Sequence, residues 1–200
     1  MSTLEELLRG GDVSKDAAQA SERALAQARA LGLTDVSYAI EPSPVGDLLV
    51  AVTPRGLIRL AYNARENADT VLGELARRIS PRVVEAPAAL DDVRRELDEY
   101  FEHKRTSFDI PIDWRLHDGF GRRVLRATAR IPFGKVLTYG EVAAKAGSPR
   151  AYRAAGNALG SNRMPIVVPC HRVVATGGKL GGYTGGIERK EYLLELEGVR

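Results

Sequence analysis

The chain has 200 residues, of which 44% are hydrophobic, and a formal net charge of +3. This length is enough for one large or two small globular domains, and no run of about 18 apolar residues suggests a membrane span. A single cysteine excludes an intramolecular disulfide and a cysteine-rich zinc site. Because the start of the chain is acidic at Glu5 and Glu6 and does not match a signal peptide, we expect a cytoplasmic protein. With one cysteine we also expect no metal, and we expect no other cofactor.

The charge is unevenly distributed along the chain. Residues 114–172 contain eleven Lys and Arg but only two acidic residues, Asp118 and Glu141, so this segment carries +9 and the rest of the chain −6. A basic segment indicates a polyanionic partner, with nucleic acid the first candidate. A solvated arginine-rich surface would give the same count.

The first part of the chain changes from a helical to a strand pattern. Alanines at helical spacing predict a helix over residues 14–31, within an N-terminal helical extension of residues 1–35. Alternating apolar residues then predict strands at 36–40, 48–53 and 57–62. Short turns between these strands favour a small antiparallel meander.

Two predicted helices follow the meander. Apolar residues predict helices over 67–79 and 90–103, with a short strand at 81–84 between them. Strands followed by helices indicate an α+β domain, which we assign to residues 36–110. The charged, proline-containing segment 106–114 is interpreted as a linker.

Residues 111–200 are predicted to form a mainly helical domain that begins with a basic helix over 118–129. Thr138 and Glu141 match a capping box that begins a short helix. Ser148-Pro149 match the cap and first turn of a second helix. Two short helices separated by Gly147 are typical of a helix-turn-helix, although an ordinary helical hairpin fits the pattern equally well.

The second of these helices has two different sides. Small residues on one side can pack closely against a neighbour: Ala151, Ala154, Ala155 and Ala158. On the other side Arg150, Arg153 and Asn157 recur at helical spacing and can contact phosphates or a base stack.

Cys170 is the candidate reactive residue. It ends an apolar run that begins at Pro165, and His171 and Arg172 follow it directly. Free cysteines are most often inert core residues, but two polar side chains beside an apolar run are costly to bury without partners. A thiolate is the reactive form, and a histidine held by a carboxylate such as Glu197 can generate it.

The segment 177–186 is glycine-dense and contains Tyr183 and Thr184. It does not match a phosphate-binding loop, because no Lys-Ser or Lys-Thr pair begins a helix after it. Such glycines either let a planar ligand approach the backbone or mark a flexible turn.

These motifs together resemble those of the O6-alkylguanine-DNA alkyltransferases, also called methylated-DNA–protein-cysteine methyltransferases. The resemblance rests on Pro169-Cys170-His171-Arg172-Val173, on Asn162 before it, and on the glycine-rich segment and Glu197-Gly198 after it. It is strong from about Phe120 to Gly198 and weaker over 36–108. It implies an RNase H-like α+β domain followed by a helix-turn-helix alkyltransferase domain.

The resemblance also implies a function. An alkyl group would pass irreversibly from O6 of guanine in double-stranded DNA to Cys170, once per protein molecule, and O4-alkylthymine remains an open second substrate. The protein would bind the minor groove as a monomer and flip the damaged nucleotide into a pocket. Cooperative assembly of several copies on DNA remains an open alternative.

Residue roles carried over from the family follow the matching positions. His171 would take the thiol proton through water, Glu197 would orient His171, and Asn162 would brace the turn. Tyr139 would protonate or hydrogen-bond the guanine, and Arg153 would fill the gap left by the flipped base. The remaining positions implied at the DNA are Thr138, Arg150, Ala151, Tyr152, Asn157 and Arg172, and those implied around the base are Val173, Gly181, Tyr183 and Thr184.

One position departs from the family pattern: Tyr152 is large where a small residue is expected, which leaves the fit to the groove open. Two other functional classes also remain open. A helix-turn-helix regulator would bind a specific sequence and use Cys170 structurally, and a cysteine hydrolase would regenerate its thiol.

Overall fold

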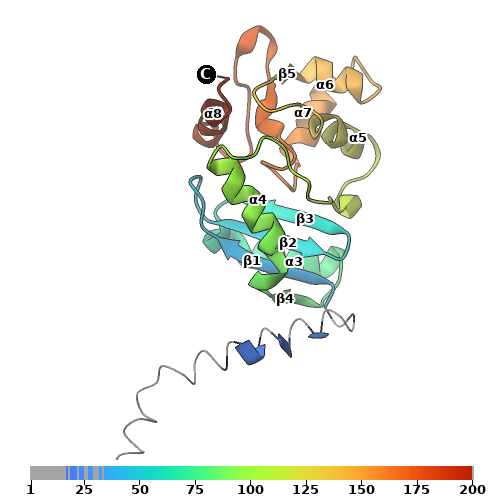
Figure 1. Ribbon diagram of the computed structural model, residues 1–200. Coiled ribbons are helices and arrows are strands. Elements are labelled where there is room, and N and C mark those ends of the chain that lie inside the picture. Colours follow the sequence, from blue (N-terminus) through green and yellow to red (C-terminus); the bar gives the residue numbers. More distant parts are fainter. Residues whose placement is uncertain are drawn as a thin grey trace, which may run out of the picture.

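The computed structural model describes residues 34–199 and, before them, residues 17, 19–21, 23–24, 27–28 and 32. The helix predicted over residues 14–31 therefore lies mostly outside the described part of the chain and stays a prediction. From residue 36 the chain forms a sheet domain with a helix on each face, followed by a helical domain that sits at one end of it (Figure 1).

The sheet contains the predicted meander and a fourth strand. The strands are β1 (Val36–Glu41), β2 (Leu48–Thr53), β3 (Gly56–Ala61) and β4 (Val83–Glu85), in the order β3-β2-β1-β4. The first three pair antiparallel, as predicted, but β4 runs parallel to β1, so the sheet is mixed and not purely antiparallel. The reason is topological, because α3 connects β3 to β4 and crosses the sheet to its far edge. β4 therefore lies beside β1 and runs in the same direction as β1.

Two helices cover the sheet. α3 (Ala64–Arg78) packs on one face and α4 (Asp91–Phe101), preceded by the 3₁₀ helix η1 (Pro87–Leu90), packs on the other (Figure 1). Strand β2 is buried on both faces, because Val50 and Val52 face the α4 side whereas Leu49 and Ala51 face the α3 side.

The segment predicted to be a linker packs against the edge of this sheet. The Leu57 amide donates to the Pro111 carbonyl at 2.8 Å, and the Asp113 amide donates to the Leu57 carbonyl at 2.8 Å. Asp113 is buried and accepts hydrogen bonds from Thr53 and Arg115. Ile110, Ile112 and Trp114 pack on the core, and Ile112 forms an isolated bridge with Leu57, so this charged, proline-containing segment lies along β3 and is not a solvated connection.

The C-terminal part consists of short elements. The helices are η2 (Trp114–Leu116), α5 (Gly119–Thr128), α6 (Tyr139–Lys145), α7 (Tyr152–Gly160), η3 (Cys170–Arg172), η4 (Thr176–Gly178) and α8 (Ile187–Leu196), and the strands are β5 (Leu137–Thr138) and β6 (Val173–Val174). The predicted capping box at the start of α6 is present. None of the described helices is long and apolar enough to cross a membrane.

α7 begins later than predicted. Residues 149 and 150 form a turn, closed by a hydrogen bond from the Ala151 amide to the Ser148 carbonyl at 2.9 Å, and the helix starts at Tyr152. Ala155 and Ala158 are buried as expected, but Ala154 is exposed and Leu159 takes the inner position instead.

Candidate active site

Cys170 lies at the start of η3, within a buried run that extends from Met164 to Val174. Its side chain belongs to the core, with 6% of the residue exposed. The turn before it includes Ile166 in the left-handed region at φ 72°, a conformation that β-branched residues rarely adopt. Such backbone strain persists only where surrounding contacts hold it, and it is concentrated at functional sites.

Asn162 provides those contacts. Its side-chain amide donates to the Val168 carbonyl at 2.8 Å and to the Cys170 Sγ at 3.1 Å, and its Oδ1 accepts from the Met164 amide at 3.0 Å. One buried side chain therefore connects both ends of the turn to the thiol. This agrees with the bracing position expected for Asn162.

Glu197 is a buried acceptor at the end of α8. Its Oε1 accepts from the Tyr100 hydroxyl at 2.7 Å, from His171 Nε2 at 2.8 Å and from Arg172 Nη2 at 2.8 Å. Its Oε2 accepts from Arg172 Nε at 2.8 Å. Burial alone would raise the pKa of Glu197, but the hydrogen bonds from His171 and Arg172 outweigh it and lower the pKa to about 2.

His171 is fully buried, and its hydrogen bond defines its tautomer. Burial lowers the pKa of His171 and outweighs the opposing effect of Glu197. The lowered pKa favours the neutral ring. Because the Glu197 carboxylate can only accept, Nε2 carries the proton and Nδ1 has the free lone pair. Nδ1 is buried and has no hydrogen-bond partner in the described part of the chain, so this nitrogen is available as a base.

The thiol itself is in an environment that opposes ionisation. Burial raises the pKa of Cys170, whereas the Asn162 amide, the positive charge of Lys190 and the Tyr183 hydroxyl act in the opposite direction. Lys190 is fully buried on α8, burial lowers its pKa to about 8, and it donates to the carbonyls of Val173 and Leu180. It therefore joins the backbone after Cys170 to the glycine-rich segment.

A pocket of about 310 Å³ opens beside the thiol. It is lined by Tyr139, Gly156, Leu159, Gly160, Cys170, Gly182, Tyr183 and Thr184. The position of Tyr139 follows from the parallel pairing of β5 with β6, which aligns Leu137 with Val173 and so brings the start of α6 next to the end of η3. The Tyr139 hydroxyl donates to the Gly182 carbonyl at 3.4 Å.

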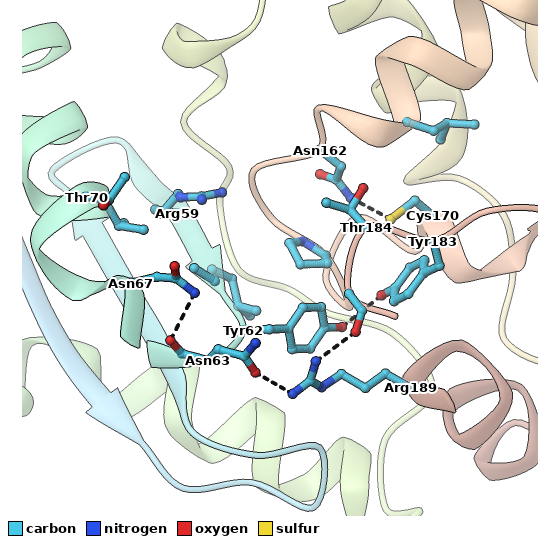
Figure 2. Close-up of a pocket in the computed structure, with 16 residues that line it drawn as sticks. Arg59, Tyr62, Asn63, Asn67, Thr70, Asn162, Cys170, Tyr183, Thr184 and Arg189 are labelled. Carbon is cyan, nitrogen blue, oxygen red and sulfur yellow. Dashed lines mark hydrogen bonds between the residues drawn. The ribbon is translucent and has the colours of Figure 1, made fainter. Parts of the chain in front are cut away.

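A second cavity, of about 250 Å³, meets the thiol from the seam between the two domains (Figure 2). Cys170, Leu159, Tyr183 and Thr184 line both cavities. Side chains of the sheet domain, including Arg59, Tyr62 and Asn67, form the opposite wall. Cys170 is thus accessible to small molecules although little of its surface is exposed.

The outer side of α7 carries exposed polar groups near the first pocket. Arg153 and Asn157 are exposed on the helix, as the helical spacing predicted, and Arg150 is exposed in the turn before it. Tyr152 is 50% exposed, and the Arg153 guanidinium lies over its ring, 5.6 Å from the centroid. α7 therefore presents a basic and aromatic surface next to the wall of the pocket.

Three sequence-based assignments need correction. Arg172 was expected at the DNA, but it is buried and paired with Glu197, because a guanidinium this deep needs a carboxylate partner. Val173, expected beside the base, is 1% exposed and packs in the core. Gly181 does not line the pocket itself but lies behind Tyr139, where a Cβ would meet the tyrosine hydroxyl at 2.8 Å.

Sequence reasoning also missed two residues of the site. Tyr100 sits on the apolar side of α4, where it looked like core, and no sequence signal connects it to Glu197 across 97 positions. Lys190 lies in a helix with several other charged residues, so its sequence did not distinguish it from a solvent-exposed lysine. Within the described part of the chain no three His, Cys, Asp or Glu side chains come together as metal ligands would.

The fold and site define a two-domain protein with a lone cysteine thiol between a histidine–glutamate pair and a pocket. Two family descriptions match it: the ribonuclease-like domain of 6-O-methylguanine DNA methyltransferase over residues 36–114, and the DNA-binding domain of the same family over 119–199. The chain belongs to the methylated-DNA–protein-cysteine methyltransferase family.

Individual relatives agree with this assignment. The methylated-DNA–protein-cysteine methyltransferase of Methanosarcina barkeri is 38% identical over 80% of this chain and 96% of its own length, and that of Mycolicibacterium paratuberculosis is 43% identical over 72% and 88%. The crystal structure of Mycobacterium tuberculosis O6-methylguanine methyltransferase superposes with a TM-score of 0.69 at 38% identity, covering 81% of this chain and 92% of that one.

Proposed function

We propose that the protein repairs alkylated DNA by direct transfer of the alkyl group from O6 of guanine to Cys170. The observation that carries this proposal is the single thiol at the base of a pocket, tied to Asn162 and followed by the buried His171–Glu197 pair. A bond forms between Sγ and the alkyl carbon while the bond from that carbon to O6 breaks, and its electron pair stays with the guanine. Each molecule acts once, because the thioether has no second cysteine to restore it.

The thiol loses its proton to His171 through a water molecule. Support comes from the unpartnered Nδ1 of a histidine whose Nε2 is held by Glu197. Because Glu197 remains ionised, it stabilises the positive charge that His171 gains in this step. Asn162 donates to the sulfur and stabilises the thiolate that results.

Tyr139 donates a proton or hydrogen bond to the guanine as the alkyl group leaves. Burial raises the pKa of Tyr139, with the nearby thiol acting in the same direction, so its hydroxyl keeps its proton at neutral pH. Its place in the wall of the pocket with Tyr183 and Thr184 supports this role. This donation stabilises the negative charge that develops on the guanine as the bond from O6 to the alkyl carbon breaks.

The DNA-binding surface is α7 and the capped start of α6. A buried pocket cannot reach a base inside a duplex, so the damaged nucleotide must be flipped out, with Arg153 filling its place from the minor groove. Arg150, Ala151, Tyr152, Asn157 and Thr138 lie on the elements that would face the duplex. A related structure, Mycobacterium tuberculosis OGT in complex with DNA, matches 80% of this chain with a TM-score of 0.69.

The test is stoichiometric. The protein is incubated with a duplex that contains O6-methylguanine, and the intact protein is weighed before and after. We expect a gain of one CH₂ unit located on Cys170, no more than one lesion repaired per molecule, and no gain in Cys170→Ser. A missing adduct, or many repairs per molecule as in a hydrolase, would overturn the proposal.

Base flipping has its own test. Arg153→Ala should slow repair of the duplex more than repair of the same lesion in a single strand, because only the duplex has to be opened. Arg150→Ala is the matched control, since it removes the same charge in the turn before α7. Equal effects of Arg153→Ala on both substrates would contradict the role of Arg153.

A further inference from the structure

Tyr62 brings a hydroxyl group of the sheet domain into contact with the glycine-rich segment near the thiol. Tyr62 directly follows β3, and its hydroxyl lies 2.8 Å from the hydroxyl of Tyr183 in the glycine-rich segment (Figure 2). The two rings are 6.2 Å apart between centroids. Although 121 positions separate them in sequence, this pair joins the two domains at the wall of the cavities that meet at Cys170.

Tyr62 is held firmly in this position by Arg189. The guanidinium lies 4.9 Å from the centroid of the Tyr62 ring, and it donates to the Val45 carbonyl at 2.8 Å, the Gly185 carbonyl at 2.8 Å and Asn63 Oδ1 at 2.6 Å. An arginine fixed by three acceptors restricts the ring that it stacks on.

Gly185 closes the same contact from the other side. A Cβ at Gly185 would lie 2.5 Å from Tyr62 Cε2 and 2.7 Å from Tyr183 Cε1, so only glycine allows the two rings to meet here. The tyrosine pair is therefore a built contact between the domains.

Tyr183 connects this pair to the thiol. It lines both cavities with Cys170, and the Tyr183 side chain is one of the groups that oppose the burial-driven rise in the pKa of the thiol. A hydroxyl that donates to sulfur still has lone pairs to accept with, and a donor placed on them polarises the O–H bond. The Tyr62 hydroxyl is at the right distance to be that donor.

We propose that Tyr62 is a positioning residue for Cys170: its hydroxyl donates to Tyr183 and so directs the Tyr183 proton toward the thiolate. The sheet domain would thereby assist the chemistry without contacting the substrate. The inference rests on the proposed role of Cys170 as the nucleophile.

Other groups also face the thiol, and they have to be held constant. They are Lys190 from α8, Tyr139 from α6, Asn162 from the turn after α7, and His171 beside it. Tyr62→Phe leaves all of them in place and keeps the ring under Arg189, so it removes only the hydroxyl.

The first experiment measures the thiol without DNA. Cys170 is the only cysteine, so the rate of its alkylation by iodoacetamide as a function of pH reports its own pKa. We expect Tyr62→Phe to raise that pKa by about half a unit to one unit, the size of one lost hydrogen bond. Tyr38→Phe, a tyrosine of the same domain that lies on β1, is the matched control and should change nothing.

Two further variants define the outcome. Tyr183→Phe should shift the profile as well, and the double variant should add nothing to Tyr183→Phe, because Tyr62 acts through Tyr183. An unchanged profile in Tyr62→Phe, an additive double variant, or an equal shift in Tyr38→Phe would overturn the proposal. Thermal unfolding of each variant shows whether the fold is retained.

The second experiment uses the duplex with O6-methylguanine. We expect Tyr62→Phe to slow alkyl transfer about two- to tenfold at neutral pH without weakening duplex binding, and to recover the wild-type rate at higher pH. If neither wild type nor variant transfers the alkyl group, the proposed function fails while the iodoacetamide profile still decides the role of Tyr62. A loss of duplex affinity in place of rate would contradict a positioning role.

Discussion

The central strand β2 and the surroundings of the thiol bury different kinds of side chain. In the sheet domain β2 is buried throughout and its buried residues are almost all apolar, as in the Leu49, Val50 and Ala51 run. Around the thiol, by contrast, His171, Arg172, Lys190 and Glu197 are all buried. Apolar burial stabilises without fixing exact geometry, whereas a satisfied polar network fixes positions at a cost in desolvation. Burial at β2 thus contributes mainly stability, whereas burial around the thiol also fixes the positions of polar groups.

The substitution Glu197→Gln tests this comparison with the largest expected effect. It leaves the buried Arg172 without a charged partner, so we expect a loss of roughly 3–5 kcal/mol in the free energy of unfolding. Alkyl transfer should fall by on the order of 10²-fold, because His171 loses the charge that supports it as a base. Urea denaturation and single-turnover kinetics measure the two effects. Glu195→Gln, exposed on the same helix, should change neither.

Leu49→Ala is the counterpart in the sheet domain. Leu49 is fully buried on the side of the sheet that faces α3, away from the thiol. We expect a loss of about 3 kcal/mol from the lost burial and the cavity. The rate of alkyl transfer, measured well below the unfolding temperature, should stay at the wild-type value. If Leu49→Ala lowered the rate of alkyl transfer together with the free energy of unfolding, the packing at β2 would also determine the geometry around the thiol, against this comparison.

A third prediction concerns the junction between the domains. His117 is 9% exposed, and its Nε2 has no partner among the described residues. Burial, with Arg163 and Arg78 nearby, lowers the pKa of His117 to about 4 from 6.5. Since the unfolded chain binds this proton more readily, the stabilisation is complete above pH 6.5 and is lost as the pH falls toward 4.

The size of that pH effect follows from the shift. One such group corresponds to about 3 kcal/mol across the window, and His117→Leu should remove this share of the slope. Unfolding free energies from urea titrations between pH 7 and 4 give the measurement. Because burial also lowers the pKa of His171, part of the slope should remain in the variant. An unchanged slope would contradict the assignment.

The smallest effect is expected at the capping box of α6. The Thr138 hydroxyl accepts from the Glu141 amide at 3.3 Å, and the Glu141 carboxylate accepts from the Thr138 amide at 2.6 Å. Thr138→Ala should cost about 1 kcal/mol of stability, and Thr138→Ser should retain most of it. If Thr138→Ala lowered duplex affinity much more than stability, Thr138 would act mainly at the DNA.

Local patterns predicted much of this molecule. The meander, the helices on the sheet, the capping box and the grouping of Cys170, His171 and Glu197 follow from alternation, helical spacing and motif. The direction of β4 and the first residue of α7 could not be predicted in this way. A local apolar pattern does not specify which strand a segment pairs with or where a turn closes. The polar face of α7 was nevertheless predicted correctly at Arg153 and Asn157, whereas Arg150 lies in the turn before the helix.

The sequence by itself determined which residues are the candidates for chemistry: one thiol, the base next to it and a carboxylate near the end of the chain. Only the tertiary structure decided their partners. It placed Arg172 against Glu197 in the interior, brought Tyr100 to the same carboxylate, and joined Tyr62 to Tyr183. The physical reason is that buried polar groups must find partners wherever the folded chain provides them, and that choice depends on contacts between residues far apart in sequence.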